Sequence, residues 1–410
     1  MTERVETVII GGGQAGLAMS YHLSRLGREH MVLEEKWPGH RWRTERWDAF
    51  ALQIPNWTLQ LPGYAYQGDD PDGFVGRDEV AQFVEDYAAF IRAPVRCGVR
   101  VTALRQKPGA DRLLVESNDA IIEAASVVVA TGPYQRPAVS PLAAAMPGWV
   151  FQLHSSGYRN PRQLPPGAVL VVGSGASGSQ ITEDLCEGGR HVYLAAGSHR
   201  RRVRRYRGRD IVRWQWEMGV YDQMVENVPP EDRLGGLGNI TGVRGGHDID
   251  IRRFAADGVV LLGHLRDVQD GKFTFAADLE QSLARADESY HRLLHAVDDY
   301  IKKTGLDAPE PDATSPSATV PTPITALDLR TSGITSVVWS TGFRDDFGWI
   351  HLPVFDGAAR PVHRRGVTRH PGVYFLGLRW LHTIASSSLL GVGRDAEYLA
   401  EHIACENVNR

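Results

Sequence analysis

Two segments of this chain have the glycine spacing that receives the diphosphate of a dinucleotide. One runs from Gly11 to Gly16 and the other from Gly173 to Gly178, and both read G-x-G-x-x-G. In this pattern the first glycine makes a tight turn, the second lets the backbone approach the phosphates, and the third allows the helix to pack closely on the strand. The residues expected to line the two turns are Gly11, Gly13, Gln14, Ala15, Gly16, Gly173, Gly175, Ser177 and Gly178.

The residues that follow the two turns differ in charge. Glu34, with Glu35 beside it, stands at the end of the strand after the first turn, where a carboxylate can accept hydrogen bonds from both ribose hydroxyls. The stretch after the second turn has no carboxylate and contains Ser198, Arg200 and Arg201. An arginine there offers a planar fork of donors to a 2′-phosphate. The second site is therefore predicted to bind NADPH rather than NADH.

The elements around both turns predict an α/β fold with two β-α-β units. Strands are predicted at 5–10, 30–33, 127–130, 169–172, 191–196, 337–340 and 372–376, and helices at 14–26, 77–90, 176–187 and 393–403. Residues 99–104 and 113–116 predict a small antiparallel pair, and 306–323, rich in Pro, Ser, Thr and Asp, predicts an exposed connection.

Bulk composition excludes several classes of function. With 410 residues, 42% of them hydrophobic, the chain can bury at least two cores. Its 45 basic and 49 acidic side chains leave a net charge of −4, which creates no general field for nucleic acid or an anionic membrane. The three cysteines are far apart without a CxxC motif, so neither a disulfide framework nor a dithiol redox centre is predicted.

Localisation follows from what the chain lacks. No run of about 18 apolar residues occurs, and the first residues read as a strand entering a glycine turn rather than as a signal peptide. We therefore expect a soluble, cytoplasmic protein without membrane insertion. Its oligomeric state stays open.

Seven arginines lie between Arg200 and Arg209. We interpret most of them as a solvent-exposed basic face. A nucleic-acid-binding patch is the alternative, but the glycine turn just upstream and the acidic overall balance argue against it.

Further motifs carry a resemblance to a known family. The first strand after the 77–116 region ends in an A-T-G turn at Thr131 and Gly132. A later strand ends in an S-T-G turn at Thr341 and Gly342. Trp42 follows the first β-α-β unit. Together with the two glycine turns and Glu34, these residues resemble the two-dinucleotide-binding flavoproteins. Within them the chain is similar to the class B flavin monooxygenases and to the bacterial group named flavoproteins of potassium transport.

The resemblance implies a glutathione-reductase-like fold of two Rossmann-like domains, the second inserted into the first. Residues 1–160 and 325–410 would form the FAD-binding domain. Residues 161–324 would form the NADPH-binding domain with a substrate-pocket insertion. We expect residues 211–264 to shape that pocket, because they follow the nucleotide unit and match no nucleotide motif.

The resemblance also implies a reaction. Hydride would pass from NADPH to FAD, and reduced FAD would react with O2 to give a C4a-(hydro)peroxyflavin that transfers one oxygen atom to a small-molecule substrate. His154 and Tyr158 match the family's F-x-G-x-x-x-H-x-x-x-(Y/F) pattern, in which Gly148 and Val150 replace its Phe and Gly. Tyr158-Arg159 lacks the ending typical of ketone-inserting enzymes, which favours N- or S-oxygenation.

Candidate catalytic residues from the resemblance are Asn56, His154 and Tyr158. A structural hydrogen bond at the domain crossing is the alternative for His154, and a simple turn beside Pro55 is the alternative for Asn56. Trp42 and Gln53 are expected near the flavin, as are the backbone N–H groups of Leu390 and Gly391 at the start of the last helix. The family's Gly-Asp ribityl contact is replaced here by Gly377-Leu378.

Two other functions remain open at this stage. One is a reductase that passes electrons to a protein or quinone without oxygenation. The other is a flavin-binding sensor without turnover.

Overall fold

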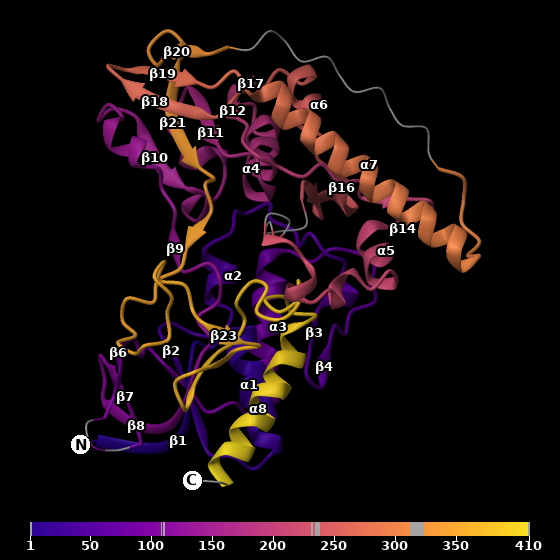
Figure 1. Cartoon of the computed structure of the whole chain (residues 1–410). Coiled ribbons are helices and arrows are strands. Elements are labelled where there is room, and N and C mark those ends of the chain that lie inside the picture. The colour runs from indigo at the N-terminus through magenta and orange to yellow at the C-terminus, as the bar shows by residue number, and fades with distance from the viewer. Residues whose placement is uncertain are drawn as a thin grey trace.

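The computed structural model describes residues 2–107, 109, 111–230, 233, 238–311 and 324–408. A mixed sheet and a parallel sheet form the centres of two units, which lie one above the other in Figure 1. The helices are α1 (Gln14–Arg25), α2 (His40–Thr44), α3 (Arg77–Phe90), α4 (Ala176–Glu187), α5 (Ile211–Glu217), α6 (Ile251–Ala256), α7 (Leu279–Thr304) and α8 (Val392–Val408).

The first sheet has nine strands and contains the strand that precedes the first glycine turn. Its main order is β23-β24-β25-β8-β1-β2-β5, with β7 beside β8 and β6 beside β7. The strands are β1 (Thr2–Ile10), β2 (His30–Glu34), β5 (Val95–Cys97), β6 (Val101–Gln106), β7 (Leu113–Ser117), β8 (Ile121–Val129), β23 (His363–Arg364), β24 (Val367–Thr368) and β25 (Val373–Phe375). Because β1, β2, β8 and β25 run parallel, their carboxyl ends meet at one edge of the sheet.

The second sheet has five parallel strands in the order β10-β21-β11-β12-β17. They are β10 (Phe151–His154), β11 (Ala168–Val172), β12 (Val192–Ala195), β17 (Val260–Leu262) and β21 (Ile334–Trp339). The second glycine turn follows β11 and leads into α4, just as the first follows β1 and leads into α1.

Short antiparallel ribbons complete the fold. They pair β3 (Gln60–Leu61) with β4 (Tyr64–Ala65), β9 (Arg136–Pro137) with β22 (Phe343–Arg344), β13 (Arg205–Tyr206) with β14 (Arg209–Asp210), β15 (Ile240–Thr241) with β16 (His247–Asp248), and β19 (Lys272–Phe275) with both β18 (Leu265–Gln269) and β20 (Ala326–Asp328). The β9–β22 pair is where the chain leaves the first unit and returns to it.

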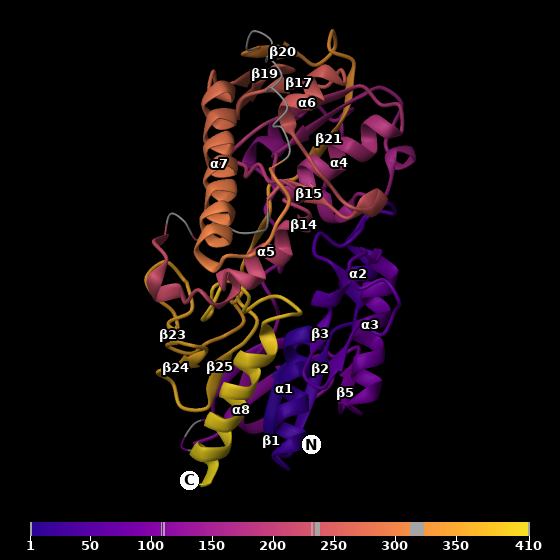
Figure 2. The same cartoon turned by 90° about the vertical axis from the view of Figure 1, so that its right-hand side faces the viewer.

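Both faces of each sheet are covered, which explains the continuous apolar runs in the central strands. In the first unit α1, α3 and α8 cover one face and residues 347–354 cover the other. Figure 2 shows α1 and α8 side by side below the second unit. In the second unit α4, α6 and the start of α7 cover one face, while the ribbon β18-β19-β20 covers the other. The central residues Val127, Val128 and Val129 are therefore all buried.

Helices α3 and α4 have the predicted bounds. Strands β10 and β21 differ from prediction, because the structure places both in the second sheet although the predicted domain boundaries assign them to the first domain. The buried residues Val337 and Val338 of β21 pair with β11, which explains this placement. Helix α7 was not predicted from the sequence. Of the predicted connection 306–323, residues 306–311 form no helix or strand, and 312–323 lie outside the described residues.

The interpretation of an exposed arginine face is wrong. Of the seven arginines only Arg205 is exposed, and four of the others form ion pairs with carboxylates from later in the chain. The pairs are Arg201 with Asp250 and Asp287, Arg204 with Asp210, Arg207 with Asp298, and Arg209 with Glu217. Placing so many cations inside the fold requires such partners, because an unpaired buried charge is costly. This segment therefore holds α5, α6 and α7 together.

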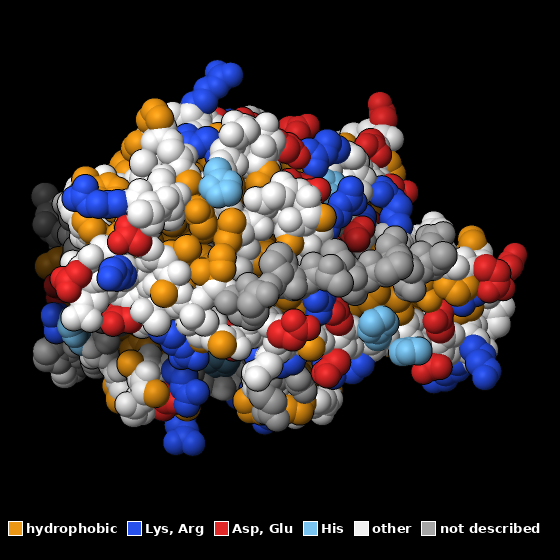
Figure 3. Space-filling view, turned by 90° about the horizontal axis from the view of Figure 1, so that it is seen from above, with side chains coloured by type: hydrophobic (Ala, Val, Ile, Leu, Met, Phe, Trp, Pro, Cys, Tyr) orange, Lys and Arg blue, Asp and Glu red, His pale blue; other side chains and the backbone are white. Residues whose placement is uncertain are grey.

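The outer surface is mixed in charge where Figure 3 shows it. Basic and acidic side chains alternate across that face of the second unit, as expected for a chain with a net charge of −4. Among the described residues, the helices are all too short or too polar to span a bilayer.

We expect Arg204→Ala to lower the free energy of unfolding by about 3–5 kcal/mol, because it leaves Asp210 without its cation in a buried site. The Arg204 side chain is only 2% exposed, donates twice to Asp210 at 2.8 and 2.6 Å, and donates to the Gln53 carbonyl at 2.7 Å. Urea unfolding measures the change. Arg205→Ala, in the same segment but exposed, is the control and should cost about 0.5 kcal/mol or less. Equal losses in both variants would contradict a stabilising role for the buried pair.

Candidate functional site

A cavity of about 540 Å3 opens at the carboxyl edge of the first sheet. The loops after β1, β2 and β8 form most of its wall, so the parallel strands bring together residues that are far apart in sequence. Among its lining residues are Gly11, Gly13, Gln14, Ala15, Glu34, Glu35, Trp42, Thr131, Gly132, Gly377 and Ser387. Most of the residues predicted to bind the first dinucleotide therefore share one cavity.

The three glycines of the first turn differ in what a side chain at each position would contact. Gly11 has φ +111°, and a Cβ there would lie 2.5 Å from the Ala130 carbonyl oxygen. A Cβ on Gly16 would lie 1.9 Å from the Gly11 carbonyl oxygen, so the helix could not approach the strand. A Cβ on Gly13 would meet nothing within 4 Å. The fold needs the outer glycines, whereas Gly13 leaves space that a ligand can use.

Glu34 is held at the mouth of this turn. Its Oε2 accepts from Gly12 N at 2.7 Å and its Oε1 from Lys36 N at 2.9 Å. Each carboxylate oxygen keeps a further acceptor position. The carboxylate is thus fixed where the two hydroxyls of a ribose would reach it.

The second turn repeats this geometry closely. Gly173 has φ +104°, and a Cβ there would lie 2.5 Å from the Ser340 carbonyl oxygen. A Cβ on Gly178 would lie 1.8 Å from the Gly173 carbonyl oxygen, whereas one on Gly175 would meet nothing within 4 Å. The chain therefore has two cradles of the same design, each with free space at its middle glycine.

The arginines after β12 are not equivalent. Arg201 is neutralised by Asp250 and Asp287 at 2.9 and 2.8 Å. Arg200 and Arg202 instead line a cavity of about 600 Å3 that reaches Trp380 and Ile384 of the first unit. Ser198 is exposed.

Arg202 has no carboxylate partner within the described residues. Its Nη1 donates to Ser289 Oγ at 2.8 Å, and its Nε is buried without a partner. Burial, together with the nearby charges of Arg200 and Arg292, lowers the pKa of Arg202 to about 10. An added anion would therefore stabilise the charged form of this guanidinium.

The sequence analysis missed His264 and Asp278 beside the second cradle. Asp278 accepts from the His264 backbone N–H at 3.1 Å and lies 2.7 Å from Nδ1 of the ring, which orients the ring. The Nε2 atom then lies 3.0 Å from where a Cβ on Gly197 would stand, so the ring faces the turn after β12. No motif marks these residues, because β17 and α7 bring them to this place from elsewhere in the chain.

Asn56 lies in a short 3-10 helix (Asn56–Thr58) and is 3% exposed. Its Oδ1 accepts from Val75 N at 2.8 Å and its Nδ2 donates to the Asp70 carbonyl at 2.9 Å. Both ends of the amide thus bind backbone. Its proposed catalytic role stays a prediction.

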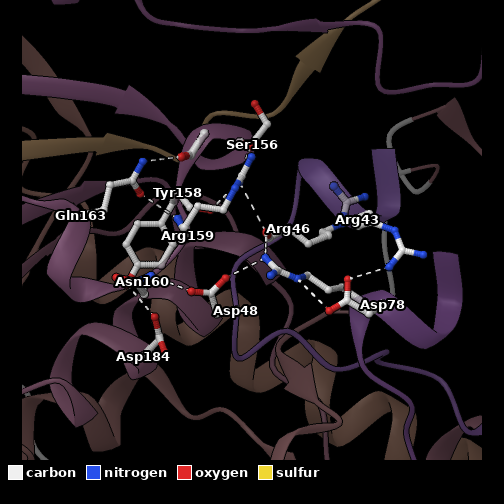
Figure 4. A network of polar contacts seen from close by, with 12 residues as sticks. Arg43, Arg46, Asp48, Asp78, Ser156, Tyr158, Arg159, Asn160, Gln163 and Asp184 are labelled. Carbon is white, nitrogen blue, oxygen red and sulfur yellow. Dashed lines mark hydrogen bonds and ion pairs between the residues drawn. The ribbon is translucent and has the colours of Figure 1, made fainter. Parts of the chain in front are cut away.

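His154 and Tyr158 lie where the chain enters the second unit. His154 Nδ1 accepts from Ser156 N at 3.2 Å, so the proton is on Nε2, which donates to the Gly342 carbonyl at 2.8 Å. Burial lowers the pKa of His154, which keeps the ring neutral. Tyr158 donates to Asp184 of α4 at 2.6 Å, and burial raises the pKa of its hydroxyl (Figure 4). These bonds fit the structural alternative for His154, and both catalytic roles stay predictions.

Other predicted residues lie near the boundary between the units. Gln53 Nε2 donates to the carbonyls of Gly238 at 3.1 Å and Ile240 at 2.8 Å, so it joins the two units. Leu390 and Gly391 line a cavity of about 290 Å3 at the start of α8, whose first turn lies toward the second unit in Figures 1 and 2. Thr341 donates to the Ala138 carbonyl beside the β9–β22 pair. Their contacts with a cofactor stay predictions.

Arg46 and Tyr134 also line the first cavity and were missed by the sequence analysis. The available signal was the density of arginines around Trp42, in the run from Gly39 to Arg46.

Known sequences match the whole chain. Residues 8–213, which include both cradles, match the family model described as pyridine nucleotide-disulphide oxidoreductase. An uncharacterized CzcO-like oxidoreductase of Geobacillus kaustophilus is 33% identical, over 98% of this chain and 99% of its own length. An indole-3-pyruvate monooxygenase of Oryza sativa subsp. japonica is 31% identical, over 46% of this chain and 48% of its own length.

Solved structures share the fold. A mutant flavin monooxygenase from Stenotrophomonas maltophilia superposes with a TM-score of 0.68 at 19% identity, covering 99% of both chains. OTEMO in complex with FAD and NADP superposes with a TM-score of 0.56 at 16% identity, covering 99% of this chain and 86% of that one. The predicted fold class of two Rossmann-like units is thereby confirmed.

We expect Gly175→Ala to separate ligand binding from folding. The added methyl meets no protein atom, so the free energy of unfolding should change by about 1 kcal/mol or less, whereas NADPH binding should weaken about tenfold or more because the methyl fills the phosphate space. Gly178→Ala, the matched variant, should destabilise the fold. Titration calorimetry and urea unfolding measure both. Unchanged NADPH affinity in Gly175→Ala would contradict the cradle.

The free energy of unfolding should fall as the pH drops from about 7 to about 5. Burial lowers the pKa of His154 in the folded state, so below the unfolded value of about 6.5 the unfolded chain binds a proton that the folded chain does not. The same direction holds for His22, His30, His40, His199 and His363. Urea unfolding at several pH values tests this, and His154→Gln should make the decline shallower. A decline equally steep in this variant would mean that His154 does not contribute.

Proposed function

The chain belongs to the pyridine nucleotide-disulphide oxidoreductase family, and from this we propose that it is an NADPH-dependent FAD monooxygenase acting on a small molecule. The predicted resemblance to the two-dinucleotide flavoproteins is confirmed by this membership and by the flavin monooxygenase fold. The reaction that we propose uses O2 to oxygenate a nitrogen or sulfur atom of the substrate.

One observation carries the proposal: two cradles of equal geometry end in opposite charge. Glu34 closes the first and suits the ribose of FAD, whereas the second is followed by arginines and suits NADPH. Gly13 and Gly175 leave the space that two diphosphates need. FAD supplies the two-electron chemistry and the reaction with O2, while the protein orients both dinucleotides and keeps water out. OTEMO, of the same fold, is a complex with both FAD and NADP.

The cysteines support oxygen as the electron acceptor. Cys97 lies on β5, Cys186 on α4 and Cys405 on α8, so the three cysteines lie on three separate elements. A reductase that passes electrons through a neighbouring dithiol needs two cysteines in contact. The relatives named as monooxygenases support the same acceptor.

For the 2′-phosphate we assign Arg200 and Arg202, with Ser198 beside them. Arg201, which the sequence also suggests, already has two carboxylate partners and would have to break an ion pair to bind a phosphate. Arg202 has no such partner among the described residues, and it faces the cavity with Arg200.

Arg202→Gln should lower kcat/KM for NADPH about ten- to a hundred-fold, because one charged hydrogen bond to the phosphate is lost. The value for NADH should stay the same, since NADH has no 2′-phosphate. Steady-state kinetics with both nucleotides measure this. Arg205→Gln is the matched control, because Arg205 is exposed and bonds only to backbone carbonyls. Equal losses with NADPH and NADH would remove Arg202 from phosphate recognition.

Oxygenation itself is tested with isotopically labelled O2. Anaerobic NADPH should bleach the yellow holoenzyme, and 18O2 should then label the product of a thioether or tertiary amine in step with NADPH consumption. A cyclic ketone should stay unlabelled. Bleaching followed by electron transfer to a quinone, without labelled product, would instead identify a reductase. A flavin that NADPH never bleaches would identify a sensor.

A further inference from the structure

The first cavity has three parts that follow the length of a dinucleotide. Glu34 marks the adenosine end, and the glycine turn marks the diphosphate. The remaining wall, with Trp42, Arg46 and Tyr134, is left for the flavin ring. Tyr134 contacts Phe343 of β22 with ring centroids 5.2 Å apart, so this part of the cavity lies at the boundary between the two units.

Two cations lie in this third part: Arg41, which donates to the Tyr134 carbonyl, and Arg46, which three aromatic rings surround. The guanidinium carbon of Arg46 lies 5.1 Å from the centre of the Trp42 ring and 5.8 Å from those of Phe50 and Tyr134. Within the described residues no carboxylate forms an ion pair with it, and its Nη1 donates only to the carbonyl of Glu45 at 2.9 Å. Burial lowers the pKa of this guanidinium, as do the neighbouring charges of Arg41 and Arg159. The carboxylate of Glu45 acts on this pKa in the opposite direction, without forming an ion pair with Arg46 in the described structure. The protein thus keeps a partly buried cation that no carboxylate among the described residues bonds directly.

The backbone of Arg46 is held from two sides. Its carbonyl accepts from Arg77 at 2.9 Å and from Arg159 at 3.4 Å, and Figure 4 shows Arg159 reaching it from the chain crossing. The next residue, Trp47, is 4% exposed and packs in the core of the second unit. Arg46 is therefore fixed where the two units meet, and this is where hydride must pass between two bound dinucleotides.

Hydride transfer changes the charge at that place. A hydride brings two electrons and one proton to the oxidised flavin ring, so the ring gains one negative charge when no second proton follows, and NADPH leaves as NADP+. A partly buried cation that no carboxylate bonds directly attracts such a charge strongly. A diphosphate needs Arg46 less, because the glycine cradle and the start of α1 already face it.

We propose that Arg46 stabilises the negative charge that the flavin ring acquires on reduction. This role rests on the proposed function, because it requires FAD in the first cavity. It makes Arg46 a determinant of the redox potential rather than of FAD binding, and the aromatic rings serve to limit its hydration.

The experiment uses the FAD-loaded protein and two readouts other than turnover. Arg46→Gln should make the midpoint potential of the bound flavin more negative. It should also weaken binding of sulfite, which adds a negative charge to the oxidised ring, about tenfold or more. Arg46→Lys keeps the charge and should restore most of both values. Arg43→Gln is the matched control, because Arg43 lies on α2 outside the cavity, pairs with Glu85 at 3.0 Å, and should change neither readout.

Tyr134→Ala provides a second test that leaves the arginine in place. Removing the ring admits water to Arg46, so both readouts should shift in the same direction as in Arg46→Gln but less. An unchanged potential and sulfite affinity in Arg46→Gln would overturn the proposal. Loss of FAD from Arg46→Gln, with no shift in Tyr134→Ala, would overturn it too and assign Arg46 to the diphosphate. A wild-type protein that binds no flavin would instead refute the proposed function.

Discussion

At both glycine turns the helix begins so close to the preceding strand that no side chain fits between them. A Cβ on Gly16 would lie within 2 Å of the Gly11 carbonyl oxygen, and a Cβ on Gly178 would lie equally close to the Gly173 carbonyl oxygen. This closeness aims the first backbone N–H groups of α1 and α4 at the same edge as the parallel strands. The cavities, the fixed carboxylate of Glu34 and the arginines after β12 all take their places from it. The proposed function therefore depends on the close approach of helix and strand backbone at each turn. The side chains near each turn then select which dinucleotide it binds.

How far the sequence predicts this structure depends on the range of the interactions involved. The bounds of α3 and α4 and the position of Glu34 follow from local spacing, and the structure agrees with them. The membership of β10 and β21 in the second sheet was not predicted, because pairing between strands almost two hundred residues apart leaves no local pattern. The same reason applies to Arg201 and Arg204. Their carboxylate partners come close only when the chain folds. A run of arginines in the sequence is therefore typical of a solvent-exposed surface.

Asn56, His154 and Tyr158 illustrate a limit of motif matching. His154 and Tyr158 follow the family pattern and Asn56 lies near a family asparagine, and the polar atoms of each are engaged by backbone or by a carboxylate. Arg46, which was not predicted from the sequence, lies in the cavity and forms no ion pair with a carboxylate in the described structure. Charges that lack a partner point to a ligand more directly than residues that match a pattern, because folding alone gives no reason to keep them.

Residues 222–225 of the second unit contact residues 382–394 of the first through backbone groups and an ion pair. Here Met224 bridges Thr383, Val225 N–H donates to the His382 carbonyl at 2.8 Å, and Asp222 pairs with Arg394. Both charged side chains are more than half exposed, so their pair is worth little in water. The β9–β22 pairing and the Gln53 hydrogen bonds also join the two units, so the exposed Asp222–Arg394 pair adds little to holding them together.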